Sequence, residues 1–229
     1  MTTVQAEVEA QKKAAAERAL ELVRPGTTIG LGTGTTSRYF IEALADRVRA
    51  GLHIQAVVTS RESERLAKAG GITLTDRIDG SLDLAVDGAD EIDPSLNCLK
   101  GRGGALTREK IVAHASRRFV LIADEGKLVP RLGRGPVPVE ILSFLWEATS
   151  HAIEQLGGRP QLRMGDIAEP YRTDNGNLIL DTSFDAVDAR LGAAIRAIPG
   201  VVDHGLFFGI ARAAMVGTAS GVRVLGEPP

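Results

Sequence analysis

Cysteine and aromatic residues are scarce in this chain, and each scarcity excludes a class of chemistry. Cys98 is the single cysteine among 229 residues, which excludes an internal disulfide and a cysteine metal cage and fits a reducing compartment. Aromatic residues make up only 4% of the chain, and its three methionines and one tryptophan are too scattered for a cofactor-binding box. We therefore expect neither redox nor metal chemistry.

A charge excess of one sign is also missing, as is a long apolar run. With 27 basic and 29 acidic residues the formal charge is −2, so nothing indicates a surface for nucleic acid or for an anionic membrane. No run of about 20 apolar residues occurs, and the N-terminus is rich in Ala, Glu and Lys instead of carrying an apolar secretion signal. We expect a cytoplasmic protein with no nucleic-acid or membrane partner.

Glycine, by contrast, is abundant, at 26 of 229 residues against a typical share of about 7%. Strand and helix patterns alternate along the first part of the chain, and Thr59 with Glu62 resembles a helix cap. The apolar runs 82–86 and 119–123 lack polar alternation, as strands covered on both faces do. This order predicts an α/β fold with a doubly wound, mostly parallel, Rossmann-like sheet.

The order of elements changes near Gly133. The segments that follow predict strands over 136–142, 159–164, 177–184 and 200–207, and helices over 143–156 and 186–197. Their sequence, β-α-β-β-α-β, is the ferredoxin-like signature. We assign residues 134–206 to a smaller ferredoxin-like α+β domain, and residues 1–133 plus 207–229 to a Rossmann-like catalytic domain whose sheet the closing strands rejoin.

The segment Gly30–Thr36 (GLGTGTT) lies between a predicted strand and a predicted helix, where free N–H groups and the helix dipole favour an anion. A dinucleotide fingerprint needs glycine at position 35 and a P-loop needs Gly-Lys-Ser/Thr, but Thr35 follows Gly34 directly. We therefore expect this segment to bind a small phosphate group. The alternative is a tight turn whose threonines only cap the helix.

Four acids, Asp87, Asp90, Glu91 and Asp93, follow the apolar run 82–86. Catalytic groups of open α/β sheets collect at the carboxyl ends of strands. Crowded carboxylates can also divide the roles of acid and base, because repulsion raises one pKa. Two alternatives stay open, a Mg²⁺ site and an Asx turn of solvated acids.

Lysine is rare, with six residues at positions 12, 13, 68, 100, 110 and 127. Lys100 precedes the run Gly101-Arg102-Gly103-Gly104, whose amides can form an anion hole. Glu109 lies one turn into the next predicted helix. The alternative for Arg-Glu-Lys at 108–110 is an ordinary solvated helix face.

Taken together, these segments resemble the type A ribose-5-phosphate isomerase family. The resemblance covers nearly the whole chain in order and rests on GLGTGTTS, TSRESERLAKAGGI, DLAVDGADEIDPSLNCLKGRGGALTREKIVA, IADEGKLVPRLG, PVPVEIL, TDNGNLILD and IPGVVDHGLFFGIA. It implies an aldose–ketose isomerase that interconverts D-ribose 5-phosphate and D-ribulose 5-phosphate. It further implies a cis-enediolate intermediate, a place in the non-oxidative pentose phosphate pathway, and no metal or organic cofactor.

The resemblance also implies a role for each motif. Glu109 is the expected base that moves a proton between C2 and C1, and Lys100 with the amides around Gly101 and Gly103 is expected to stabilise the enediolate. Asp87, Asp90 and Lys100 match the group that opens the sugar ring and binds hydroxyls. The other expected substrate-binding or phosphate-binding residues are Thr33, Gly34, Thr35, Thr36, Gly88, Ala89, Arg102, Lys127 and Lys12.

The chain departs from the family pattern at three positions, where Thr35 and Gly126 replace serine and Arg102 replaces glycine. None of these changes removes an expected catalytic group. A sugar-phosphate sensor is disfavoured because the chain leaves no room for a nucleic-acid-binding module. An amino-sugar phosphate deaminase is disfavoured because no histidine lies in the three motifs. The resemblance predicts a homodimer or homotetramer.

Overall fold

The computed structural model describes residues 3–166 and 169–227, and it divides into two compact units. Unit 1 comprises Met1–Ala89, Arg108–Leu128 and Gly209–Pro229, and unit 2 comprises Asp90–Thr107 and Val129–Phe208. The sequence-based borders placed residues 90–107, 129–133 and 207–208 with the first domain instead. Those borders remain a prediction, because a compact unit is not the same as an independently folding domain. Within the described residues, no helix is both long and apolar enough to cross a membrane.

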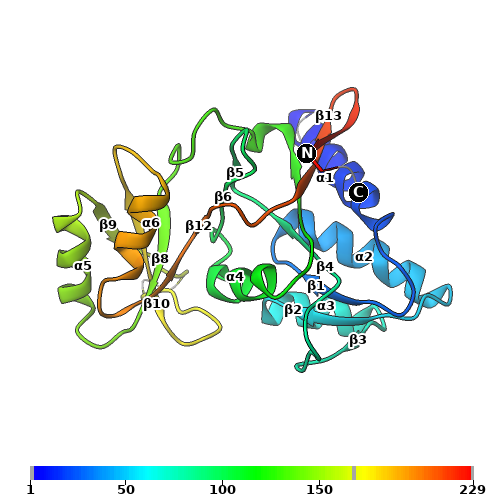
Figure 1. Cartoon of the computed structure of the whole chain (residues 1–229), viewed down its shortest axis with the longest axis horizontal. Coiled ribbons are helices and arrows are strands. Elements are labelled where there is room, and N and C mark those ends of the chain that lie inside the picture. Colours follow the sequence, from blue (N-terminus) through cyan, green and yellow to red (C-terminus); the bar gives the residue numbers. More distant parts are fainter. Residues whose placement is uncertain (1–2, 167–168, 228–229) are drawn as a thin grey trace. The chain divides into compact units, whose positions relative to one another are not determined.

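Unit 1 is built on a seven-stranded sheet (Figure 1) with the order β14-β13-β7-β4-β1-β2-β3. Its strands are β1 (Thr28–Leu31), β2 (Gln55–Val58), β3 (Thr73–Leu74), β4 (Leu84–Gly88), β7 (Phe119–Asp124), β13 (Ala213–Thr218) and β14 (Gly221–Gly226). Neighbouring strands are parallel except for β13 and β14. The predicted doubly wound sheet is confirmed, and the closing segment rejoins it beside β7.

Helices cover both faces of this sheet. They are α1 (Thr3–Leu20), α2 (Thr35–Arg49), α3 (Arg61–Ala69) and α4 (Leu106–His114), of which α4 starts in unit 2. Ile29 and Leu31 of β1 belong to one core cluster with Phe40 of α2. Gly30 lies between them and faces Val112 of α4. Because successive residues of a strand point to opposite faces, α2 and α4 lie on opposite sides of the sheet.

The direction of winding reverses between β1 and β4. Strands β2 and β3 follow on one side of β1, whereas β4, β7 and β13 follow on the other. In open α/β sheets, ligands bind outside the carboxyl ends of the strands at such a switch point. The topology of unit 1 therefore indicates that a ligand would bind at the carboxyl ends of β1 and β4.

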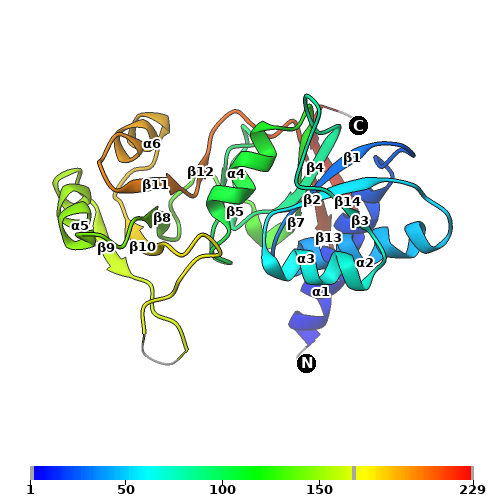
Figure 2. The same cartoon turned by 90° about the horizontal axis from the view of Figure 1, so that it is seen from below.

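Unit 2 contains a four-stranded antiparallel sheet with two helices on one face (Figure 2). Its elements are β8 (Val137–Ile141), α5 (Trp146–Gln155), β9 (Arg159–Leu162), β10 (Leu178–Ser183), α6 (Ala189–Arg196) and β11 (Val201–His204). The spatial order β11-β8-β10-β9 is that of a β-α-β-β-α-β unit with its two central strands first and third in sequence. The predicted ferredoxin-like fold is confirmed.

A second sheet of unit 2 was not predicted. It consists of β5 (Glu91–Ile92), β6 (Cys98–Leu99) and β12 (Leu206–Phe207) in the order β12-β6-β5. Two-residue strands show no periodicity in a sequence, so this sheet gives no local signal. Cys98 is buried in it, as expected of a core residue, and β6 leads directly into Lys100.

Two local expectations were wrong. Ser60, not Thr59, caps α3, because its Oγ accepts a hydrogen bond from the Ser63 amide at 3.1 Å, while the Thr59 hydroxyl donates to the Leu31 carbonyl at 3.2 Å. Helix α5 begins at Trp146 instead of residue 143. Leu145, immediately before it, has a φ of 47°, a left-handed conformation that cannot continue into an α-helix.

Candidate active site

The glycine-rich segment Gly30–Thr36 includes the carboxyl end of β1, and α2 begins within it at Thr35. Gly34 has a φ of +102°, which glycine adopts without the steric cost that a side chain imposes. Thr36 in the first turn of α2 is 8% exposed. The segment thus places a threonine hydroxyl and free backbone N–H groups at a helix N-terminus, where an anion is favoured.

Thr33 holds this segment to its neighbours. Its hydroxyl lies 2.7 Å from the Thr59 hydroxyl, and its amide donates to Asp87 Oδ1 at 3.0 Å. The Ser63 hydroxyl donates to the Gly32 carbonyl at 2.6 Å. The expectation that Thr33 binds phosphate remains a prediction. In the structure its hydroxyl joins the loop to Thr59.

Asp87 is 2% exposed at the end of β4, and three groups donate to its Oδ1. They are the Thr33 amide at 3.0 Å, the Ser37 hydroxyl at 3.1 Å and the Gly88 amide at 2.7 Å. These three hydrogen bonds fix the orientation of the Asp87 carboxylate. Sequence reasoning missed Ser37, because no spacing or motif connects it to a residue fifty positions away.

The other three acids of segment 87–93 have partners in unit 2. Asp90 Oδ2 accepts from the Arg102 amide at 3.1 Å, and Asp93 Oδ1 accepts from two following amides, as in an Asx turn. Glu91 is fully buried and accepts from the amides of residues 133, 134 and 135. In the described part of the chain, no three His, Cys, Asp or Glu side chains form a group that could hold a metal ion. Each of these acids therefore binds a different set of backbone amides.

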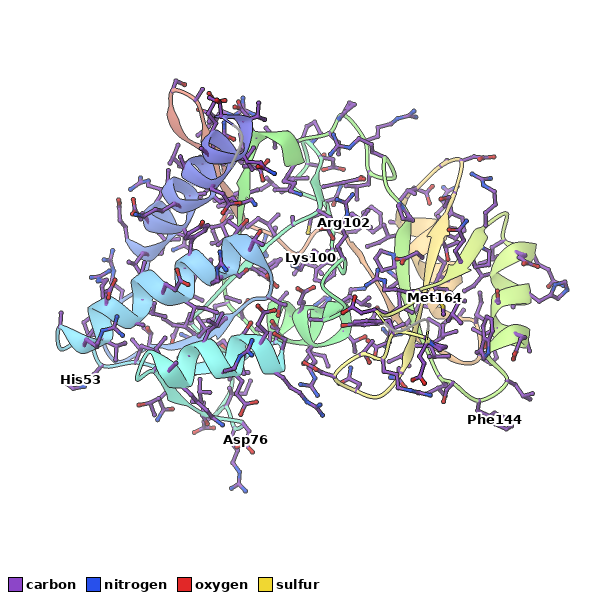
Figure 3. All side chains as sticks on the ribbon, turned by 180° about the vertical axis from the view of Figure 1, so that it is seen from behind. His53, Asp76, Lys100, Arg102, Phe144 and Met164 are labelled. Carbon is purple, nitrogen blue, oxygen red and sulfur yellow. The ribbon has the colours of Figure 1, made fainter. Side chains whose placement is uncertain are left out.

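Lys100 is 2% exposed and follows β6 in unit 2. Its amide donates to the Gly205 carbonyl at 2.9 Å, and its Nζ lies 5.8 Å from the centre of the Phe207 ring, a cation–π distance. A Cβ at position 205 would come within 2.0 Å of the Lys100 carbonyl, so only glycine permits this approach. Figure 3 labels Lys100 and Arg102 in the segment after β6.

Glu109 lies in the first turn of α4 and is only 4% exposed. The alternative of a solvated face is therefore wrong for Glu109 and for Lys110, which is 9% exposed. Within unit 1, α4 is the crossover between the parallel strands β4 and β7. Such a helix runs back along the sheet, so its N-terminus lies at the carboxyl edge. Val112, one turn after Glu109, packs against Gly30 of β1.

Lys127 ends a short 3-10 helix, η1 (Glu125–Lys127), that follows β7. Asp124 caps this helix by accepting from the Gly126 amide at 3.1 Å. Helix α1 reaches the same turn, since the Gln11 side chain donates to Glu125 Oε1 at 2.6 Å. Lys127 and the α1 segment that contains Lys12 therefore belong to one corner of unit 1.

Lys12 itself pairs with Glu9 at 2.7 Å, and the Tyr39 hydroxyl donates to the other Glu9 oxygen at 2.5 Å. The hydrogen bonds from Lys12 and Tyr39 lower the pKa of Glu9 below its usual value of 4.5. The same contact raises the pKa of Tyr39 above 10.0. Sequence reasoning named Lys12 but neither partner.

A second missed cluster surrounds Glu140 of β8, which is fully buried. Its carboxylate accepts from the Thr107 and Thr173 hydroxyls at 2.5 and 2.8 Å and from the Asn175 and Asn177 side chains at 3.0 and 2.9 Å. Thr107 lies in the first turn of α4. The TDNGN and PVE segments quoted above thus share one buried carboxylate in unit 2.

Comparison with known proteins gives one consistent result. Residues 55–221 match the sequence model of the family described as ribose 5-phosphate isomerase A (phosphoriboisomerase A). The chain is 47% identical over 223 residues to the ribose-5-phosphate isomerase A of Thermomicrobium roseum, covering 95% of this chain and 94% of the relative. The solved ribose 5-phosphate isomerase A of Methanocaldococcus jannaschii superimposes with a TM-score of 0.92 at 39% identity, covering 96% and 99% of the two chains. A D-ribose-5-phosphate isomerase in complex with phospho-erythronic acid also superimposes with a TM-score of 0.92, at 40% identity, covering 96% and 99%.

Proposed function

The chain belongs to the ribose-5-phosphate isomerase A family, and from this premise we propose that Glu109 is the base that interconverts D-ribose 5-phosphate and D-ribulose 5-phosphate through a cis-enediolate. The isomerase activity follows from the family. The intermediate, the roles of single residues and the place in the non-oxidative pentose phosphate pathway are the proposal. A homodimer or homotetramer in the cytoplasm remains part of the same expectation.

In the proposed proton transfer, Glu109 acts in two steps. The Glu109 carboxylate takes the proton from C2 of the open-chain aldose. The electron pair of the broken C–H bond forms the C1–C2 double bond, and the π pair of the C1 carbonyl moves onto O1 to give the enediolate. Glu109 then returns the proton to C1, while the hydroxyl proton moves from O2 to O1, and the ketose results. Burial at 4% exposure supports this role, because a buried side chain is held in place and can be aligned with the proton that it transfers.

The enediolate carries a negative charge that fixed donors must stabilise. Lys100 supplies a buried ammonium group, and the amides of Gly101 and Gly103 follow it directly in the chain. Groups that are held in place before the reaction stabilise a developing charge without a reorganisation cost. The amides of Gly101 and Gly103, beside the buried lysine, are therefore the donors that we assign to the oxyanion.

Ring opening and hydroxyl binding are assigned to Asp87 and Asp90, with Gly88 and Ala89 between them. The ester phosphate is assigned to Gly34–Thr36 at the N-terminus of α2 and to Lys127 and Lys12 at the corner of unit 1 described above. The switch point between β1 and β4 supports the assignment of Asp87 and of the threonine loop. Arg102 adds a cation beside Asp90 at 3.8 Å.

The observation that carries the mechanism is the buried Glu109 in the first turn of a helix. Glu109→Gln keeps the size of the side chain and removes the base. We expect turnover to fall by at least about 10²-fold, the lower end for general-base catalysis. Glu62→Gln is the matched control, because Glu62 also lies in the first turn of a helix but is exposed. Turnover of the Glu62→Gln variant should stay within about twofold of wild type.

The assay follows ketose formation from ribose 5-phosphate in D₂O, together with deuterium at the exchanging carbon. Phospho-erythronic acid, bound by the solved relative, serves as the binding probe. Its carboxylate resembles the enediolate, so Glu109→Gln should bind it about as tightly as wild type does. Turnover above half of the wild-type value in Glu109→Gln would refute the assignment of the base.

A further inference from the structure

Arg163 follows β9 in unit 2, and its side chain makes four hydrogen bonds and one cation–π contact that no motif predicted. Its Nε and Nη2 donate to the two carboxylate oxygens of Asp181 at 2.8 and 2.5 Å. Its Nη1 donates to the Gly101 carbonyl at 2.9 Å and to the Arg102 carbonyl at 3.1 Å. The guanidinium also lies 5.7 Å from the centre of the Tyr171 ring. The side chain of Arg163 is 14% exposed, so these contacts are largely shielded from water.

The two carbonyls that Arg163 binds fix two consecutive peptide planes of the loop. In a trans peptide the C=O and the next N–H point in opposite directions. The Gly101 carbonyl points to Arg163, and the Arg102 amide of the same plane donates to Asp90 Oδ2 on the other side. The Arg102 carbonyl also points to Arg163, so the N–H of Gly103 must point away from Arg163.

Tyr171 holds the end of the same loop. Its hydroxyl donates to the Gly103 carbonyl at 3.4 Å, and a Cβ at position 104 would lie 2.2 Å from that hydroxyl. Burial raises the pKa of Tyr171 above 10.0, so the phenol keeps the proton that it donates. Gly104 has a φ of +77°, which also favours glycine. The loop is thus clamped at three successive carbonyls.

We infer that Arg163, held by Asp181, is a positioning residue that sets the direction of the loop amides at Arg102 and Gly103. The inference rests on the proposed function, in which the Gly103 amide stabilises the enediolate and Asp90, held by the Arg102 amide, binds the sugar hydroxyls. Lysine cannot replace arginine here, because a single ammonium nitrogen lacks the planar fork that reaches a carboxylate and two carbonyls together. Arg163 acts through the loop and requires no contact with the substrate.

The test compares Arg163→Met with Arg159→Met. Arg159 is the first residue of β9, the strand that Arg163 follows, and it pairs with Asp185 at 2.9 Å in an exposed ion pair. With ribose 5-phosphate as substrate, Arg163→Met should lower kcat at least about 10-fold and change KM less than about 3-fold, because misdirected amides weaken binding of the transition state more than that of the ground state. Arg159→Met should change both constants less than about twofold.

Arg163→Lys makes the test independent of folding defects. It keeps the charge and one contact with Asp181, so it should fold even if Arg163→Met does not, and its kcat should still fall at least about 5-fold. A kcat for Arg163→Lys within twofold of wild type would overturn the inference, and so would a loss confined to KM. Glu109→Gln, measured in parallel, separates the two ideas. An active Glu109→Gln refutes the proposed function, whereas an inactive Glu109→Gln beside an unaffected Arg163→Lys refutes only the role of Arg163.

Discussion

Gly32→Ala is the substitution whose effect can be worked out most directly from the structure. A Cβ at position 32 would lie 2.0 Å from Asp87 Oδ1, 2.1 Å from its Cγ and 2.5 Å from its Cβ. Non-bonded carbon atoms approach to about 3.5 Å. The Cβ of Asp87 cannot swing away as a side-chain tip can, so the ends of β1 and β4 must separate by about 1 Å.

This displacement has a cost for stability and a separate cost for activity. Overpacking costs about 1–3 kcal/mol, and weakening of the three hydrogen bonds to Asp87 Oδ1 adds about 1–2 kcal/mol. For a chain of this size, about 2–5 kcal/mol lowers Tm by roughly 5–15 °C. A shift of about 1 Å in Asp87 should lower kcat about 10²-fold.

Thermal unfolding followed by circular dichroism measures the first effect, and the ketose assay measures the second. Gly88→Ala is the control for stability, because the nearest atom to its added Cβ, Ser37 Oγ, is 3.7 Å away, an ordinary contact. We expect its Tm to stay within about 2 °C of wild type. Equal Tm values for Gly32→Ala and Gly88→Ala would refute the reasoning, since only the first substitution forces the strand ends apart.

Two further predictions concern α2 and α1. Thr36→Val should raise KM for ribose 5-phosphate more than it lowers kcat, because a phosphate contact is equal in the ground and transition states; an equal effect on unphosphorylated ribose would assign the hydroxyl to structure alone. The Tm difference between wild type and Tyr39→Phe should be largest between about pH 5 and pH 10. It should shrink in acid, because the lowered pKa of Glu9 gives stability that is lost as Glu9 becomes protonated. It should shrink in alkali, because the raised pKa of Tyr39 gives stability that is lost as Tyr39 ionises; a Tm difference that is flat from pH 3 to pH 11.5 would contradict this.

The parts of the fold that were predictable are those with a local signal. Strands β4 and β7 each begin with an uninterrupted apolar run, at residues 84–86 and 119–123, and a strand covered on both faces needs such a run. The β-α-β-β-α-β order of unit 2 was equally visible, because each of its elements is long enough to show its own period. The two-residue strands β5, β6 and β12 carry no period, and the pairing of β6 with β12 joins residues more than 100 positions apart.

The candidate site was predictable where a motif brings its residues together in sequence. Asp87 and Asp90, or Lys100 and Gly101, are neighbours in the chain. The groups that orient them are not, because Ser37 is 50 residues from Asp87 and Arg163 is 62 residues from Gly101. A single serine or arginine has no distinguishing feature in a sequence. Its task is defined by the distant group that it contacts, which only the fold identifies.

The segment Gly30-Leu31-Gly32 shows how one short motif can place two functional groups at once. Residues two apart on a strand point to the same face, and both glycines leave that face open. At position 30 the space is filled by Val112 of α4, to within 2.4 Å of where a Cβ would lie, and at position 32 by Asp87. Val112 is one turn from Glu109 on the same side of α4. The two glycines therefore admit the helix that carries the proposed base and the carboxylate that is proposed to open the sugar ring. They are required for close packing at the carboxyl end of β1 as well as for the turn that is proposed to bind phosphate. Sequence reasoning interpreted them only as part of an anion-binding loop and so missed their role in packing.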